Sequence, residues 1–209
     1  MNLDRATLEA CKRGDAGAFR RLVEVHERPV HGLCVALAGA ADGEDLAQET
    51  FLRVYKAIRS FDPDGPATLR AWILTIARRL CADRARHVNL GIEVAAAGDG
   101  TLPDAIDPGA DPEALAGAAS LQERLRRAVA ALPEEQRAVL VLREWDDLDY
   151  EEIAAVENVP VGTVRSRLSR AREALRAALA APAVLAAPVA PPRPTSSGDE
   201  RNQRVARAR

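Results

Sequence analysis

Apolar residues recur at three- and four-residue steps through the first 87 positions, as on one face of an α-helix. One helix is predicted over residues 4–13, and a second begins near Asp15 and is expected to kink or break at Pro29. A third is expected to start at Asp42, which suits an N-cap and is followed by acids. A fourth is expected over residues 68–87, after a loop rich in aspartate and proline. This pattern predicts a small helical domain.

The same spacing returns in the last third of the chain. Ser120 and Glu123 form the pattern of a capping box and predict a helix start, and Pro133 predicts the start of the next helix. Residues 149–176, DYEEIAAVENVPVGTVRSRLSRAREALR, then predict two short helices with Asn158 in the turn, because asparagine tolerates a left-handed backbone. That is the layout of a helix-turn-helix, whose second helix enters the DNA major groove.

Arginines crowd one side of the second of these helices. Asp149 and Glu152 predict a capping box for the helix before it. Four residues are expected to face inward: Val164, Leu168, Ala171 and Leu175. Four residues on the other side can contact bases: Arg165, Ser166, Ser169 and Arg170. Three arginines lie where phosphate contacts would position the helix: Arg167, Arg172 and Arg176. The alternative is an ordinary amphipathic helix with a solvated basic face, but five arginines against one acid are more than solubility requires.

Composition divides the chain into domains. Strand-favouring runs are missing, so the predicted fold class is all-α: two small helical domains, the C-terminal one a helix-turn-helix. Residues 88–118 contain six acids and no lysine or arginine, which predicts a flexible acidic linker between residues 1–87 and residues 119–180. Residues 181–209 are rich in proline and alanine and then polar, and we expect a disordered tail. The net charge of −2 means that any affinity for DNA must come from local basic faces.

Several classes of protein are disfavoured. The three cysteines show no CxxC spacing, which suits a reducing cytoplasm and argues against a disulfide framework. His31 and Cys34 are three residues apart, but a buried thiol beside a surface histidine explains them better than a metal site. Prolines interrupt the longest apolar stretch, so no membrane insertion is expected. We find no P-loop, ligand cluster or activated nucleophile, and therefore expect no enzyme, metal or cofactor.

The chain resembles bacterial RNA polymerase sigma factors of the extracytoplasmic-function (ECF) type, in the sigma-seventy family. Two motifs in the right order support this: DGEDLAQETFLRVYKAI, and LPEEQRAVLVLRE followed by the helix-turn-helix, with LRAWILTIARRLCADRAR between them. The resemblance implies a cytoplasmic, non-enzymatic initiation factor that binds core RNA polymerase and promoter DNA and is masked by an anti-sigma factor.

The resemblance also implies roles for individual residues. The surface expected to bind core polymerase, at the β′ clamp helices, consists of Asp45, Gln48, Glu49, Leu52 and Arg53; contacts with the β subunit are expected as well. The residues expected to hold the −10 element as a single strand are Asp62, Asp64, Thr68, Arg70, Arg78, Arg79 and Arg86. Those expected to contact the −35 element are Thr163, Arg165, Ser166, Arg167, Ser169, Arg170 and Arg172. The chain departs from the family pattern at Glu157 and Asn158, where many relatives have leucine and glycine, and at Arg79, where asparagine is common.

Two other functions remain open at this point. A conventional regulator would bind duplex DNA alone as a dimer, and a helical adaptor would bind protein only. Neither explains both motifs. Trp72, Phe61 and Tyr55 could stack on unpaired bases, although the helical spacing of Trp72 and Phe61 favours a place in the core.

Overall fold

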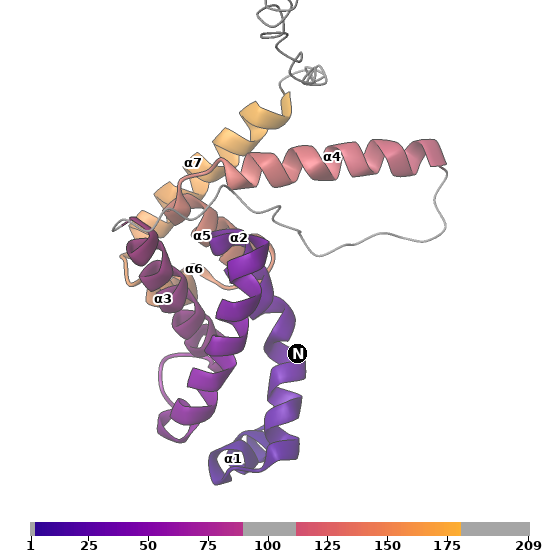
Figure 1. The fold of residues 1–209 in the computed structure, drawn as a ribbon. Helices are drawn as coiled ribbons and strands as arrows, with labels where there is room; N and C mark the ends of the chain where they lie inside the picture. Colours follow the sequence, from indigo (N-terminus) through magenta and orange to yellow (C-terminus); the bar gives the residue numbers. More distant parts are fainter. Residues whose placement is uncertain (1–2, 90–111, 181–209) are drawn as a thin grey trace, which may run out of the picture.

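The computed structural model describes residues 3–89 and 112–180, and within these ranges every regular element is helical. This confirms the predicted all-α class. In chain order the elements are α1 (Arg5–Arg13), α2 (Ala16–Ala57), the short 3-10 helix η1 (Ile58–Ser60), α3 (Leu69–Asn89), α4 (Pro112–Ala130), α5 (Glu134–Glu144), α6 (Tyr150–Glu157) and α7 (Val161–Ala180). Figure 1 shows α1–α3 on one side of the molecule, with α5–α7 packed across one end of them.

Local capping sets the first helix boundaries, as the sequence predicts. The side chain of Asp4 accepts a hydrogen bond from the backbone N–H of Thr7 at 2.8 Å. Gly14 ends α1 in the left-handed conformation, with φ at 89°, which costs glycine little. Asp15 then caps α2 by accepting from the backbone N–H of Ala18 at 2.7 Å.

The break expected at Pro29 lies elsewhere. Helix α2 runs through Pro29 and leaves helical geometry at Gly39, where φ is 84° and ψ is 170°. Proline removes one backbone hydrogen bond, but the buried residues that follow, Val30 among them, favour keeping the helix in place. Gly39 can adopt a backbone conformation that other residues avoid. Two helical segments therefore meet at Gly39, and the second begins close to the predicted start at Asp42, whose side chain pairs with Arg84 of α3.

A second correction concerns the start of α4. The capping box expected at Ser120 does not begin a helix, because α4 starts eight residues earlier at Pro112. The intervening stretch is mostly alanine, the best helix former, and proline is favoured at the first helical position. The first turns of α4 thus occupy part of the range predicted as linker. Residues 88 and 89 of the predicted linker end α3, and residues 90–111 and the tail lie outside the described residues.

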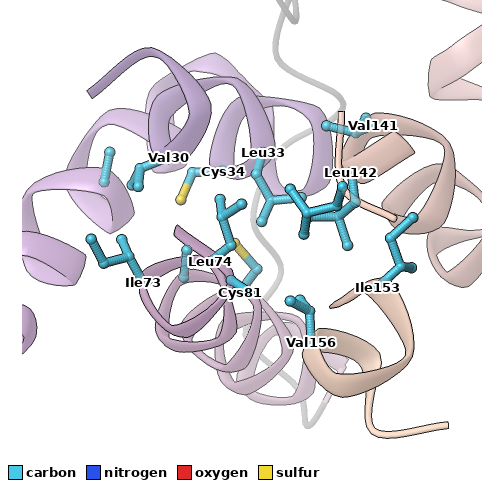
Figure 2. Packing of buried hydrophobic residues seen from close by; sticks show 14 of the residues in the cluster. Val30, Leu33, Cys34, Ile73, Leu74, Cys81, Val141, Leu142, Ile153 and Val156 are labelled. Atoms are coloured by element: carbon cyan, nitrogen blue, oxygen red, sulfur yellow. The ribbon is translucent and has the colours of Figure 1, made fainter. Parts of the chain in front are cut away.

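One continuous apolar cluster fills the space between α2 and α3 and extends to α5, α6 and α7. Figure 2 shows Leu33 of α2 and Leu74 of α3 facing Leu142 of α5, with Ile153 of α6 beside them. Phe61 is buried with its ring centroid 5.2 Å from that of Trp72, which favours the core interpretation of this pair. The two predicted domains are therefore in contact through their cores.

Candidate polymerase- and DNA-binding surfaces

The helix-turn-helix has the caps that the sequence predicts. Asp149 accepts from the backbone N–H of Glu152 at 2.7 Å, and the Glu152 carboxylate accepts from the backbone N–H of Asp149 at 3.0 Å. Asn158 is left-handed, with φ at 54°. On α7, Val164, Leu168 and Ala171 are buried and Leu175 is partly buried. These contacts fix the angle between α6 and α7.

The opposite side of α7 is open. Arg165, Ser166, Ser169 and Arg170 are all exposed. Ser166 donates to the carbonyl of Thr163 at 2.9 Å, and Arg165 lies 5.8 Å above the ring of Tyr150. Among the described residues, Ser169 and Arg170 have no side-chain partner. Ser169 and Arg170 can therefore make base and phosphate contacts without losing side-chain contacts of their own.

Two other arginines of α7 form ion pairs with acids of the same domain. Arg167 is only 16% exposed and lies 2.7 Å from Glu135 and 3.6 Å from Glu157. Arg172 donates twice to Glu144, at 3.0 and 2.6 Å. Both were expected to contact DNA, but Arg167 points to the other helices of the domain and is better placed to support them.

The face expected to bind polymerase is open in the second half of α2. Asp45, Gln48 and Arg53 are exposed, and Arg53 pairs with the half-exposed Glu49 at 2.9 Å. Leu52 is 56% exposed, and nearby Tyr55 is 51% exposed with its ring packed edge-on against Phe19. Exposed apolar groups among polar anchors are typical of a protein interface.

The loop expected to enclose a −10 base lies between η1 and α3. Asp64 pairs with Arg5 of α1 through two hydrogen bonds of 2.9 and 2.8 Å. Asp62 accepts from the backbone N–H of Asp64 at 3.0 Å. The loop is thereby held against α1, with both carboxylates exposed.

The expected −10 residues on α3, together with Thr68 directly before it, fall into two groups. Arg79 and Arg86 are exposed, and Arg86 pairs only with Asp83 of the same helix among the described residues. The other three contact the C-terminal domain: Thr68 bonds Glu152, Arg70 bonds Asp146, and Arg78 bonds both Glu134 and Glu157. No local pattern in the sequence predicts these acidic partners, except that Glu157 departs from the family pattern.

Comparison with known proteins identifies the family of this chain. Residues 22–89 match Sigma-70 region 2, and residues 122–175 match Sigma-70, region 4. The ECF RNA polymerase sigma factor SigW of Bacillus subtilis is 34% identical over 175 residues, covering 81% of this chain and 92% of that protein. The chain belongs to the sigma-70 family, in its ECF group. This sigma factor therefore acts in promoter-specific transcription initiation.

Further relatives agree. The ECF RNA polymerase sigma-E factor of Escherichia coli K12 is 34% identical over 177 residues, covering 82% of this chain and 92% of that protein. Among solved structures, CnrH in complex with the cytosolic domain of CnrY matches with a TM-score of 0.60 and 26% identity, over 85% of this chain and 97% of that one. The sigma factor RpoE, in complex with the anti-sigma factor NepR from Bartonella quintana, matches with a TM-score of 0.60 and 23% identity, over 77% and 96% of the two chains, and supports the fold.

The charged groups between the domains of this sigma factor are strongly perturbed. Burial raises the pKa of Asp146 to about 6, and the nearby Arg70 only partly opposes this. Burial, followed by repulsion from Arg70, lowers the pKa of His26 to about 4. Burial would lower the pKa of Arg78, but Glu157 and Glu134 outweigh it, and the net pKa is raised. His26 is therefore neutral near pH 7.

A shared metal at His31 and Cys34 does not fit the geometry. His31 is exposed, whereas the Cys34 thiol is buried. The described residues contain no group of three or more metal-ligating side chains. No helix in the described part of the chain is long and apolar enough to cross a membrane.

Proposed function

We propose that this sigma factor recognises two separate promoter elements while it is bound to core RNA polymerase. The exposed side of α7 holds the −35 element as duplex, and α3 with the loop before it holds the −10 element as a single strand. One observation supports this most strongly: polar readers on α7 and an apolar-polar interface on α2 are exposed together on one chain.

The DNA chemistry follows from the exposed residues. Arginine can donate two hydrogen bonds to guanine, so Arg165 and Arg170 serve as the base readers on α7. Strand opening costs a few kcal/mol per unstacked base, which capture of unpaired bases can supply without ATP. Arg79 and Arg86 track the phosphates of that strand. The factor itself performs no catalysis in this scheme, and it works in the bacterial cytoplasm with the polymerase.

The polymerase contact is the second half of the proposal. Asp45, Gln48 and Leu52 lie on the exposed side of α2 and face the β′ clamp helices, with further contacts on the β subunit. An anti-sigma factor that covers the same surfaces is the expected regulatory partner; RpoE, which shares the fold, was solved in complex with the anti-sigma factor NepR.

Run-off transcription with purified core polymerase and a library of promoter fragments tests the proposal directly. We expect transcripts only when the sigma factor is added. A dimeric regulator would instead bind its site without polymerase, and a protein-only adaptor would support no transcript. Absence of a transcript from every fragment in the library would refute the assignment.

Two variants test the polymerase contact. Replacing Gln48 and Glu49 together by alanine removes exposed polar anchors, so core affinity in a pull-down should fall while the helical circular dichroism is unchanged. The matched control replaces Glu24 and Glu27, which are exposed earlier on α2, and should bind core normally. Equal affinity of the two double variants would argue against this interface.

A second double variant, with its own control, tests the DNA contact. Replacing Arg165 and Arg170 by alanine should abolish specific transcription while core binding persists. Replacing Arg20 and Arg28, which are exposed on α2, removes the same charge and should have little effect. Full activity of the first variant would point to a protein-only role for α7.

A further inference from the structure

Arg5 of α1 bonds the middle of the −10 loop, residues 61–68, which we assign to the −10 element. Its Nη1 and Nη2 atoms donate to Oδ1 and Oδ2 of Asp64 at 2.9 and 2.8 Å, across 59 positions of the chain. We propose that Arg5 is a positioning residue: it fixes the −10 loop in the form that takes up an unpaired base, without touching that base itself. This inference rests on the proposed role of the loop in −10 recognition.

The −10 loop has a defined shape of its own. Phe61 is buried at its start, with its ring centroid 5.2 Å from that of Trp72 on α3. Asp62 then closes a tight turn, because its carbonyl accepts from the backbone N–H of Gly65 at 3.2 Å and its carboxylate accepts from that of Asp64 at 3.0 Å. The bonds of Asp62 fix the turn internally but do not orient it on the protein, because both lie within residues 62–65.

The pair with Arg5 supplies that orientation. Helix α1 is in contact with η1, and α1 and the −10 loop lie at the same end of the molecule in Figure 1. A guanidinium that bonds both oxygens of a carboxylate fixes the relative plane of the two groups as well as their distance. Helix α1 is itself anchored, since Leu8 and Cys11 are buried. Arg5 therefore ties an exposed turn to a helix that is held by the core.

The same pair compensates a charge that would oppose DNA. Asp62 and Asp64 are both exposed, and an unpaired carboxylate repels the phosphates of a strand. The hydrogen bonds from Arg5, together with its charge, hold the pKa of Asp64 below its ordinary value, so this carboxyl stays ionised and paired. With both of its oxygens occupied, Asp64 is better placed to support the loop than to contact a base.

The exposure of this pair separates loop positioning from folding. The side chains of Arg5 and Asp64 are 67% and 68% exposed. An exposed ion pair contributes little to the stability of a whole protein, so its loss should leave the melting temperature unchanged. A loop that is already ordered binds its ligand more tightly, because less conformational entropy is lost on binding. Loss of Arg5 should therefore weaken base capture in a protein that remains folded.

Base capture by the full chain bound to core polymerase tests the inference. The probe is a promoter fragment found by the run-off assay, with 2-aminopurine in place of one −10 base at a time; its fluorescence rises when that base leaves the stack. Arg5→Ala should lower the apparent affinity in this assay about two- to fivefold and leave the melting temperature and core binding unchanged. The control Arg13→Ala removes the same charge from an exposed position of α1 and should match the parent.

A charge exchange shows whether the pairing itself matters. Asp64→Arg places two guanidinium groups against each other and should weaken base capture. Adding Arg5→Asp should restore capture, because the reversed pair can form. A general effect of charge predicts the opposite, since a new acid on α1 would repel DNA further. No recovery in the double variant over Asp64→Arg alone would overturn the inference.

The remaining outcomes separate this inference from the proposed function. If Arg5→Ala and Arg13→Ala give equal signals while the parent captures the base, Arg5 does not position the loop and the proposed function stands. If the parent gives transcripts but no 2-aminopurine signal at any −10 position, the proposed role of the loop is refuted, and the inference with it. A fall in melting temperature that accompanies the loss of capture in Arg5→Ala would assign the pair to folding and overturn the positioning role.

Discussion

Replacing Arg165 and Arg167 by alanine, one at a time, compares two arginines of α7 in different surroundings. Arg165 is exposed, and its contact within the chain is a shared position over the ring of Tyr150, 5.8 Å away. An exposed cation–π contact is worth about 0.5–1 kcal/mol, so Arg165→Ala should hardly change stability. A lost bidentate base contact costs about 1–3 kcal/mol, or roughly 5- to 150-fold in affinity for the −35 duplex.

Arg167→Ala should behave in the opposite way. Its partner Glu135 is mostly exposed, and that pair contributes little. Glu157 is buried, however, and loses one of its two cationic neighbours. Partial loss of partners for a buried charge costs about 1–3 kcal/mol. At about 2–4 °C per kcal/mol for a chain of this size, the melting temperature should fall by several degrees.

Thermal unfolding followed by circular dichroism measures the stability of both variants. Fluorescence anisotropy of the polymerase-bound factor on a −35 duplex measures the affinity for DNA, at a temperature well below the melting transition. The reasoning fails if Arg165→Ala lowers the melting temperature more than Arg167→Ala does. It also fails if Arg167→Ala weakens DNA binding with no change in melting, because Arg167 would then contact DNA directly.

Three further predictions concern stability, pH and the polymerase surface. Gly43→Ala should destabilise the fold by about 1–3 kcal/mol in urea unfolding, since a Cβ there would lie 2.7 Å from the Cα of Val35. Gly162→Ala, with nothing within 4 Å of the added Cβ, should be neutral or slightly stabilising, and equal losses in both would contradict the clash. Because burial raises the pKa of Asp146 from 3.8 to about 6, the folded state binds the extra proton, and this group's contribution to stability falls as the pH rises through that window. Asp146→Asn should therefore gain about 2 kcal/mol relative to the parent between pH 4 and pH 7, and a constant difference across that range would contradict the burial effect. Leu52→Ala should weaken binding of core polymerase without lowering the melting temperature, as expected for an apolar side chain 56% exposed, and a large drop in melting would assign it to the core instead.

Features governed by neighbours in sequence could be predicted from the sequence. The capping box of Asp149 and Glu152 forms as expected, and Asn158 takes the left-handed conformation of the turn. The buried face of α7 follows from helical spacing alone. Each depends on residues within about one turn of one another, where the side chain and its partner are both visible in the sequence.

Features that depend on distant contacts could not be predicted. Pro29 is a strong breaking signal, yet the helix continues through it because the buried positions that follow align it with the core. The break at Gly39 brings Gly43 against Val35, a packing constraint that no local pattern reveals. The partners of Arg70 and Arg78 are 56 to 79 positions away in the chain.

The paired and unpaired arginines explain how a chain of net charge −2 can contain a DNA-binding site. On α7, Arg170 is exposed without a partner among the described residues, while Arg172 bonds an acid of its own domain. On α3, Arg79 is open and Arg78 is neutralised by carboxylates of the other domain. Acids that neutralise arginines inside the folded chain lower its attraction for bulk DNA, because a phosphate gains less from a cation that is already paired.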